Sequence, residues 1–283
     1  MRKKLLSIFC ILCLAVILTA CPSTPINSEQ KTEQHFKFQY GVFLGAEPED
    51  TNSMKAYRTI VVEGQPFTKQ QVSDLKSYGH IVYSYLNVGS IEEYRPYYDR
   101  FSEYTLDVYE NWEDEKWIDV TVPEWQDFIV NELAKELKDK GFDGLFIDNI
   151  DVYYMYPSEE SFEAITSILR KLKAMGFYIC INGGDVYVSE CIEKFDRLDD
   201  IFDAVNQETV FTKIIWDEED TFEEQDREES VYFQEYLSEV HEHGVDVYLL
   251  EYTQDKELAA KIKDYCREKG YDYYVSKTLN LEV

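Results

Sequence analysis

The chain has little histidine, and this limits the chemistry that it can support. Its 283 residues include four histidines, His35, His80, His241 and His243, and none lies at the end of a predicted strand. A hydrolytic zinc site or a Ser-His-Asp triad needs histidine at the reacting centre, so the sequence favours neither. We expect neither a metal nor a cofactor, and the alternative is a Mg²⁺ or Ca²⁺ site made only of carboxylates.

Cysteine and phosphate-binding glycine motifs are also scarce. Three of the six cysteines, Cys180, Cys191 and Cys266, lie beyond the N-terminal segment. Their number is odd and their spacing matches no zinc motif, so we interpret them as packing residues. One disulfide is the alternative in an exported chain. No glycine-rich phosphate loop follows a predicted strand, which disfavours nucleotide binding.

Basic residues are outnumbered two to one by acidic residues. The chain has 28 Lys and Arg against 56 Asp and Glu, a formal charge of −28. This charge repels phosphate backbones and anionic lipid headgroups, so we expect no nucleic-acid partner and no peripheral membrane binding. The run from Asp217 to Glu229 alone holds nine acids and one base. It is either a solvated surface or a segment that attracts a cationic substrate.

The first twenty residues have the pattern of a bacterial export signal. Three bases precede an apolar run from Leu5 to Ala20, which is too short and wrongly flanked for a stable membrane span. The run ends in Leu18-Thr19-Ala20-Cys21, which resembles a lipobox and implies a diacylated Cys21; an ordinary signal cleaved near Ala20 is the alternative. We therefore predict a signal peptide over 1–20, a flexible tether over 21–36 and a folded domain over 37–283. The membrane would be reached only through this lipid anchor, and the domain would be extracytoplasmic in the bacterial cell envelope. Without the signal, 25 bases face 56 acids, a charge of −31.

Short β-rich runs alternate with amphipathic stretches through the rest of the chain. Glycine follows several of these stretches, as in Tyr78-Gly79 and Lys140-Gly141, which is typical of helix ends. Eight strands in about 240 residues fit a (β/α)₈ TIM barrel better than an open doubly wound sheet. The predicted strands are Phe38–Leu44, Thr59–Val62, Ile81–Leu86, Gly144–Asp148, Phe177–Ile181, Ile201–Asn206, Asp246–Glu251 and Asp272–Ser276. The predicted helices are Thr68–Tyr78, Pro123–Lys140, Glu159–Ala174, Arg227–His243 and Lys256–Lys269.

Polar residues end four consecutive predicted strands. In a TIM barrel the catalytic groups lie at the carboxyl ends of the strands, so we expect these residues to line one concave site. Paired carboxylates suit glycoside hydrolysis, because an acid and a nucleophile or base must flank the sugar bond. For any one acid taken alone, a helix cap or a turn is the alternative. The residues are Asp148, Asn149, Asp151, Asn182, Asn206, Glu208, Glu251 and Tyr252.

The long connection after the third predicted strand holds further candidates. Glu92 and Arg95 would pair beside the pocket, or form a surface ion pair that supports the loop. The indole of Trp117 would offer its face to sugar C–H groups, or pack in the interior. Asp119 follows in the same connection.

These motifs together resemble glycoside hydrolase family 114. The resemblance covers about residues 38–281, in the family's order, and the family segment usually reads Asn-Glu where this chain has Asn206-Gln207-Glu208. It implies a (β/α)₈ enzyme of the endo-α-1,4-polygalactosaminidase type, which acts with retention on partly deacetylated galactosamine-containing polysaccharide. The matching segments are Tyr85–Ser90, Glu92, Arg95, Trp117-Ile118-Asp119, Gly141–Gly144, Asp148–Asp151, Asn206–Glu208, Glu251-Tyr252 and Lys277.

The resemblance also implies roles for individual residues. Asp148 would be the nucleophile and Glu208 the acid/base, with Glu251 as the alternative acid/base. We expect a monomer that hydrolyses a hexosamine-containing polysaccharide, for which a cationic polymer is one candidate. A catalytically inert carbohydrate-binding lipoprotein on the same barrel is the alternative. The expected substrate-binding residues are Glu92, Arg95, Trp117, Asp119, Asn149, Asp151, Asn182, Asn206, Glu251, Tyr252 and Lys277.

Overall fold

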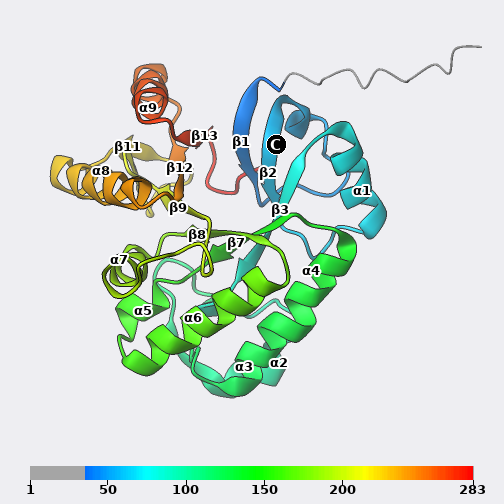
Figure 1. The fold of residues 1–283 in the computed structure, drawn as a ribbon. Helices are drawn as coiled ribbons and strands as arrows, with labels where there is room; N and C mark the ends of the chain where they lie inside the picture. Colours follow the sequence, from blue (N-terminus) through cyan, green and yellow to red (C-terminus); the bar gives the residue numbers. More distant parts are fainter. Residues whose placement is uncertain (1–35, 283) are drawn as a thin grey trace, which may run out of the picture. The chain divides into compact units, whose positions relative to one another are not determined.

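The structure, a computed structural model, describes residues 36–282. The predicted signal peptide, Cys21 and almost all of the predicted tether lie outside these residues. All eight predicted strands form one parallel sheet, hydrogen-bonded in the order β1-β2-β3-β7-β8-β9-β12-β13. The last strand lies beside the first, where the rings of Phe43 and Tyr274 are 5.3 Å apart, so the sheet nearly closes into the predicted barrel (Figure 1). The strands are β1 Phe38–Phe43, β2 Tyr57–Val62, β3 Ile81–Asn87, β7 Gly144–Asp148, β8 Tyr178–Asn182, β9 Ala204–Glu208, β12 Asp246–Tyr252 and β13 Asp272–Ser276.

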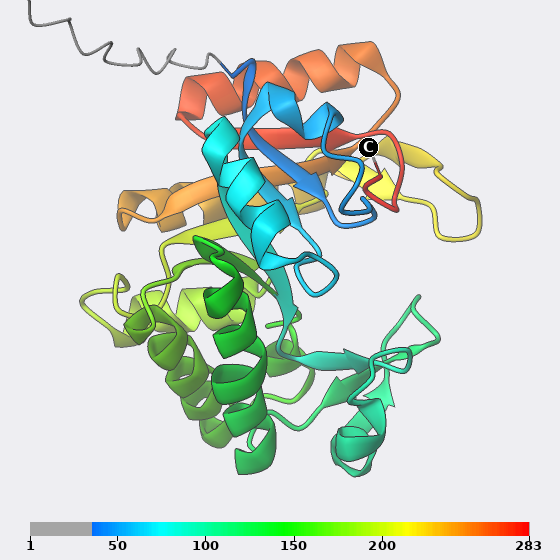
Figure 2. The same cartoon turned by 90° about the vertical axis from the view of Figure 1, so that its right-hand side faces the viewer.

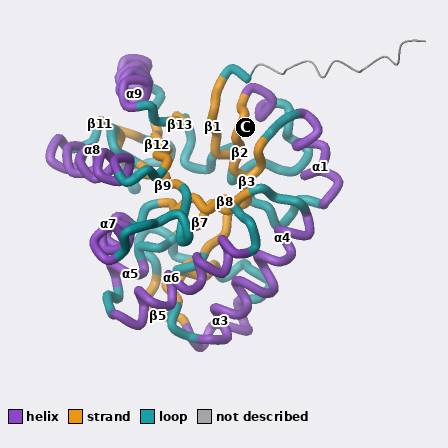
Figure 3. The backbone as a smooth tube through the Cα atoms, viewed as in Figure 1, coloured by secondary structure: helices purple, strands orange, loops and turns teal. Residues whose placement is uncertain are grey.

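Helices cover the outer side of the barrel strands (Figure 3). The five predicted helices are present, and the one predicted over Pro123–Lys140 contains a π-helical turn at Ile129–Leu133. The helix between β8 and β9 was not among the predicted five. The helices are α1 Lys69–Tyr78, α2 Tyr98–Phe101, α3 Pro123–Phe128, α4 Ala134–Lys140, α5 Val152–Met155, α6 Glu159–Ala174, α7 Asp185–Lys194, α8 Arg227–Glu242 and α9 Lys256–Lys269, with 3₁₀ turns at Ser53–Ala56 and Ser102–Tyr104.

Local signals explain where these helices begin and end. Thr68 accepts from the backbone N–H of Gln71, and the Gln71 side chain bonds back to the Thr68 N–H, which is a capping box. This helix, α1, ends at Gly79, whose φ of 111° is in the left-handed region that glycine adopts without strain. Gly141 ends α4 in the same way, with φ of 101°. The sequence therefore sets helix ends through short-range chemistry.

Alternation along the strands separates two apolar layers. Phe146 and Cys180 belong to a cluster that fills the barrel, whereas Leu145 and Ile147 belong to the larger cluster between the sheet and the helices. Successive strand residues point to opposite faces, so every second residue faces the barrel interior. Cys180, Cys191 and Cys266 are buried and free, which confirms the packing interpretation.

Two additional segments follow barrel strands on the carboxyl side. After β3, the strands β4 (Ser90–Glu92), β5 (Thr105–Val108) and β6 (Glu115–Ile118) form a small antiparallel sheet. After β9, β10 (Thr212–Ile214) and β11 (Phe222–Glu224) form a hairpin. Figure 2 shows both segments, coloured teal and yellow, projecting on the same side. Within residues 36–282, no helix has the length and apolarity that a bilayer crossing requires.

Candidate active site

The alternation of the strands brings polar side chains from three neighbouring strands together inside the barrel. Asp148 follows Phe146 on the inner side of β7, and Asn182 follows Cys180 on the inner side of β8. On β9, Asn206 and Glu208 continue the inner series that begins at Ala204. Because Gln207 falls on the other side, the unusual Asn206-Gln207-Glu208 segment still presents its acid to the barrel.

One side-chain amide connects the two central carboxylates. Nδ2 of Asn182 donates to Oδ1 of Asp148 at 2.9 Å and to Oε1 of Glu208 at 2.7 Å. The two oxygens are therefore no farther apart than the sum of these distances, about 5.6 Å, close to the roughly 5–5.5 Å of retaining glycosidases and below the roughly 6.5–9.5 Å of inverting ones. Asn206 donates to Oδ1 of Asn182 at 2.6 Å and fixes the orientation of this amide. Tyr40 in turn donates to Asn206 at 3.1 Å.

Burial raises the pKa of both carboxyls above their usual range. For Asp148, this effect is opposed by hydrogen bonds from Asn182, Tyr85 and the backbone of Asn149, which lower the pKa. For Glu208, the opposing bonds come from Tyr252 and Asn182, while the nearby charge of Asp148 raises the pKa further. Two adjacent carboxylates resist simultaneous ionisation, so the pair holds a proton more readily than either acid would alone.

A second polar network, centred on Glu115 of β6, lies beside Asp148. Oε1 of Glu115 accepts from Nδ2 of Asn149 at 2.8 Å, from Nδ2 of Asn87 at 2.9 Å and from the hydroxyl of Ser90. Burial raises the pKa of Glu115 to about 7, and the neighbouring charges of Glu92 and Asp148 contribute. The network holds Asn149, whose φ of 63° is left-handed, directly after Asp148.

Arg95 forms the predicted ion pair with Glu92, and a second acid completes the group. Its Nη2 lies 2.8 Å from Glu92 Oε1 and 2.8 Å from Glu63 Oε2. The side chains of Arg95 and Glu92 are buried, so this is not the surface ion pair of the alternative interpretation.

Glu251 does not lie with the other carboxylates. It alternates with Val247 and Leu249 on the helix-facing side of β12, and its side chain is 0% exposed. Its oxygens accept from the backbone N–H groups of Phe211 and Thr212 and from the Thr212 hydroxyl at 2.6 Å. Glu251 therefore anchors the connection between β9 and β10 through these hydrogen bonds. This position does not support the substrate contact or the alternative acid/base role that was expected for Glu251.

Four other expected residues take different places. Trp117 is 5% exposed and packs 4.5 Å from the ring of Tyr109, so the interior alternative describes it. Asp119 accepts from the N–H and hydroxyl of Thr121 and forms a local turn. Asp151 accepts from the N–H of Gly184 at 3.2 Å, and burial raises its pKa to about 7. Lys277 is exposed, directly after β13.

Several residues of the site were not among those expected from the sequence. Tyr40 and Tyr85 lie on inner positions of β1 and β3, and counting alternate residues back from Asn87 would have found Tyr85. Glu115 and Tyr109 belong to the excursion after β3, where no barrel periodicity applies. Burial raises the pKa of Tyr109, and the charges of Asp148, Asp151, Glu115 and Glu208 raise it further.

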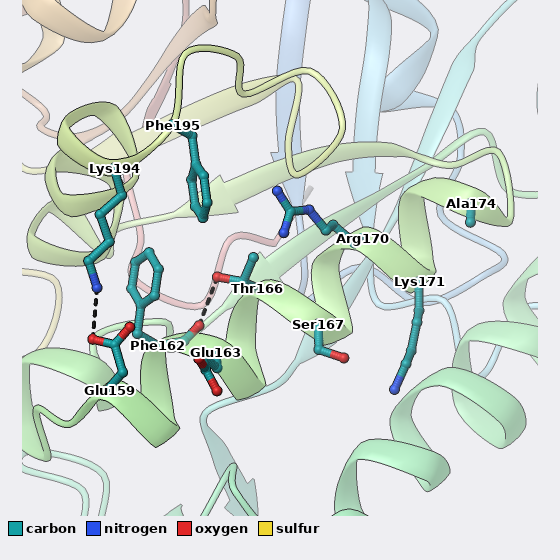
Figure 4. Close-up of a pocket in the computed structure, with 10 residues that line it drawn as sticks. All are labelled: Glu159, Phe162, Glu163, Thr166, Ser167, Arg170, Lys171, Ala174, Lys194 and Phe195. Atoms are coloured by element: carbon teal, nitrogen blue, oxygen red, sulfur yellow. Dashed lines mark hydrogen bonds and ion pairs between the residues drawn. The ribbon is translucent and has the colours of Figure 1, made fainter.

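A separate hollow of about 730 Å³ lies on the outside of the barrel (Figure 4). It is lined by residues of α6 together with Lys194 and Phe195, and contains none of the residues that surround Asp148. Lys194 is paired with Glu159 at its edge. Because the carboxylate pair is elsewhere, we place the candidate active site at the carboxyl ends of the strands. Within residues 36–282, no group of three or more His, Cys, Asp or Glu side chains has the arrangement of a metal site.

Comparisons with known proteins agree with this architecture. The chain is similar to an uncharacterized protein of Methanocaldococcus jannaschii, with 23% identity over 89% of this chain and 79% of that protein. Its structure resembles the glycoside hydrolase domain of PelA from Pseudomonas aeruginosa, with a TM-score of 0.73 at 20% identity over 87% of this chain and 96% of that one. It also resembles Aspergillus fumigatus Ega3, solved in complex with galactosamine, with a TM-score of 0.68 at 16% identity over 89% and 95% of the two chains. These likenesses confirm the TIM-barrel fold.

The family model for glycoside-hydrolase family GH114 matches residues 19–282, which is nearly the whole chain. The expectation of a glycoside hydrolase, drawn from the sequence motifs, is thereby confirmed. The chain belongs to glycoside-hydrolase family GH114.

Proposed function

We propose that the protein is a retaining endo-glycosidase that hydrolyses a hexosamine-containing polysaccharide, with Asp148 as nucleophile and Glu208 as acid/base. The observation that carries the proposal is the bridge from one Asn182 amide to both carboxylates. It holds one oxygen of each acid at most about 5.6 Å apart, which is close to the roughly 5–5.5 Å separation that suits a covalent glycosyl-enzyme.

In the first step, a carboxylate oxygen of Asp148 attacks the anomeric carbon of the bound sugar. The bond from that carbon to the glycosidic oxygen breaks, and Glu208 transfers its proton to the departing oxygen. In the second step, Glu208, now ionised, removes a proton from a water molecule. The water oxygen attacks the anomeric carbon, releases Asp148 as carboxylate and leaves Glu208 protonated for the next turnover.

The hydrogen bonds around the pair support this division of roles. Asp148 accepts from two side chains and one backbone group, which favours its charged form. The charge of Asp148 then favours the protonated form of Glu208, whose pKa burial already raises. One ionised and one protonated acid are the starting state that a retaining glycosidase needs.

An amino-sugar polymer fits the charge of the protein. A polymer of partly deacetylated hexosamine carries ammonium groups, and the chain without its first twenty residues has a charge of −31. The structurally similar protein Ega3 was solved in complex with galactosamine, so polymers of galactosamine are the first substrates to test. The resemblance of Leu18–Cys21 to a lipobox supports an extracytoplasmic, lipid-anchored location.

The test is hydrolysis of a polysaccharide panel that includes deacetylated and fully acetylated galactosaminoglycan, with released oligomers identified by mass spectrometry. We expect release from the deacetylated polymer and a loss of about 10⁴-fold or more in Asp148→Asn. Glu208→Gln should lose about 10²–10⁴-fold on natural polymer and less on a substrate with a good leaving group, with azide restoring turnover. Asp139→Asn on the surface of α4 is the matched control. Binding of polymer without release of oligomers would instead support the inert carbohydrate-binding alternative.

A further inference from the structure

The two excursions on the carboxyl side of the barrel meet through a pair of tryptophans. Trp112 lies in the turn between β5 and β6, and Trp216 lies in the connection between β10 and β11. Their ring centroids are 6.0 Å apart with an interplanar angle of 79°, an edge-to-face contact. Figure 2 shows the two excursions that carry them on the same side of the barrel. We call these two residues the tryptophan pair.

The tryptophan pair is exposed although indole is largely apolar. Trp112 is 41% exposed and Trp216 is 46% exposed. Trp117 and Trp125, in contrast, are buried. An indole with a free face is an effective surface for the C–H face of a sugar, and it also attracts cations. The exposure of both rings therefore leaves surface for a ligand.

Both excursions also reach inward to the carboxylates. The backbone N–H of Trp112 donates to the carbonyl of Tyr109, and the backbone N–H of Tyr109 donates to the carbonyl of Glu115 at 2.8 Å. The Glu115 side chain accepts from Asn149, the residue after Asp148. On the other side, Phe222 of β11 stacks 5.6 Å from Tyr252, which donates to Glu208 at 2.6 Å. The tryptophan pair thus lies at the outer ends of two segments whose inner ends line the candidate active site.

Acidic residues surround the tryptophan pair in both turns. Six exposed carboxylates flank the two indoles along the chain, and none has an ion-pair partner within residues 36–282. Unpaired carboxylates beside an aromatic face attract an ammonium group from solution over the screening length of about 8–10 Å at physiological ionic strength. The six residues are Glu110, Glu113, Asp114, Asp217, Glu218 and Glu219.

We infer that the tryptophan pair is a binding site for a cationic amino-sugar polymer, engaging sugar units away from the point of cleavage. The inference rests on the proposed function, because it assigns the same polymer to both places. The indoles stack on sugar rings and the flanking carboxylates contact the ammonium groups. Such a site holds a long chain across the carboxylate pair and contributes little to binding of a short oligosaccharide.

The test measures binding in the Asp148→Asn protein, which separates binding from cleavage. Trp112→Ala, Trp216→Ala and the double variant are titrated calorimetrically with deacetylated galactosaminoglycan and with galactosamine monosaccharide. We expect each single alanine change to weaken polymer binding about 3- to 10-fold, and we expect Trp112→Phe and Trp216→Phe, which keep an aromatic ring, to retain part of the affinity. Phe38→Ala, which removes an exposed aromatic residue at the amino end of β1, is the matched control, and circular dichroism checks folding. With Asp148 restored, the tryptophan variants should raise KM for polymer more than KM for a short oligosaccharide.

The outcomes separate this inference from the proposed function. Polymer affinity that is unchanged in both tryptophan variants, or reduced equally by Phe38→Ala, overturns the binding site even if the enzyme cleaves polymer. If polymer affinity depends on the tryptophans but the protein with Asp148 intact cleaves no polymer, the binding site is supported and the proposed hydrolysis is overturned. An Asp148→Asn protein with no measurable polymer affinity overturns the binding site as well.

Discussion

The hydroxyl of Tyr252 donates to Oε2 of Glu208 at 2.6 Å, the carboxylate oxygen that the Asn182 bridge to Asp148 does not contact. This bond stabilises the ionised form of Glu208 and so lowers its pKa, against the effect of burial. Tyr252 is therefore one of the groups that determine the pH at which the proposed acid/base loses its proton.

Tyr252→Phe should move the alkaline limit of activity to higher pH. Without the hydroxyl, the pKa of Glu208 rises, so the protonated acid persists to a higher pH. The measurement is the pH profile of kcat/KM on deacetylated polymer, with Tyr78→Phe on α1 as control. An alkaline limit that stays in place, or moves to lower pH, contradicts the assignment of Glu208 as the acid.

Asn182→Ala should lower kcat/KM by on the order of 10- to 100-fold. The change removes one donor from each carboxylate, and a hydrogen bond to a charged group contributes about 1.5–3 kcal/mol. Because the two acids then repel each other without a bridge, their apparent pKa values should also move apart. Steady-state kinetics across pH checks both effects. Activity close to that of the unchanged protein would mean that the amide bridge is not needed for catalysis.

Asn149 offers a test of backbone strain next to the nucleophile. Its φ of 63° is costly for most residues but not for glycine, so Asn149→Gly should be more stable than Asn149→Ala by about 1 kcal/mol. Both variants lose the bonds to Ser90 and Glu115, so both should lose activity. Thermal unfolding ranks the two variants, and equal stability would show that the left-handed conformation relaxes on substitution.

The folded domain should be more stable in mild acid than in mild base. Burial raises the pKa of Glu115 and Asp151 to about 7 and of Glu251 to about 8, above their unfolded values. The folded state therefore binds more protons than the unfolded state between about pH 4.5 and 8, and stability falls as pH rises through this range. Thermal unfolding should show a lower Tm at pH 8 than at pH 5.5. Glu251→Gln should lessen this difference, whereas an unchanged difference would remove Glu251 as one of its causes.

Cys21→Ser should abolish lipid anchoring. Cys21 lies outside the described residues, so this prediction depends on the sequence pattern at Leu18–Cys21 alone. The unchanged protein should fractionate with membranes and carry a diacyl mass increment, and the variant should show neither. A variant that keeps the increment would contradict the lipobox interpretation.

The sequence was sufficient to predict the barrel fold because the patterns that mark its strands and helix ends depend on a few neighbouring residues. A glycine such as Gly79 ends a helix through the conformation of one residue, and apolar periodicity marks each strand within a few residues. Alternation also carries information about the site, since it places Asp148 and Glu208 on one side of the sheet and Glu251 on the other. Counting alternate residues from Leu250 would have separated Glu251 from the inner acids.

Only the tertiary structure decided which polar groups meet. Asn182 contacts Asp148 and Glu208 because three parallel strands align their carboxyl ends, and Glu115 reaches Asn149 from an excursion with no barrel periodicity. Trp112 and Trp216 come from separate excursions, after β3 and after β9, and meet only in the folded barrel. The sequence by itself determined the eight barrel strands and five of the helices, since these depend on neighbours along the chain, but not the helix α7 or the strands of the two excursions. The contacts between excursions depend on loop paths through space, and no local pattern encodes them.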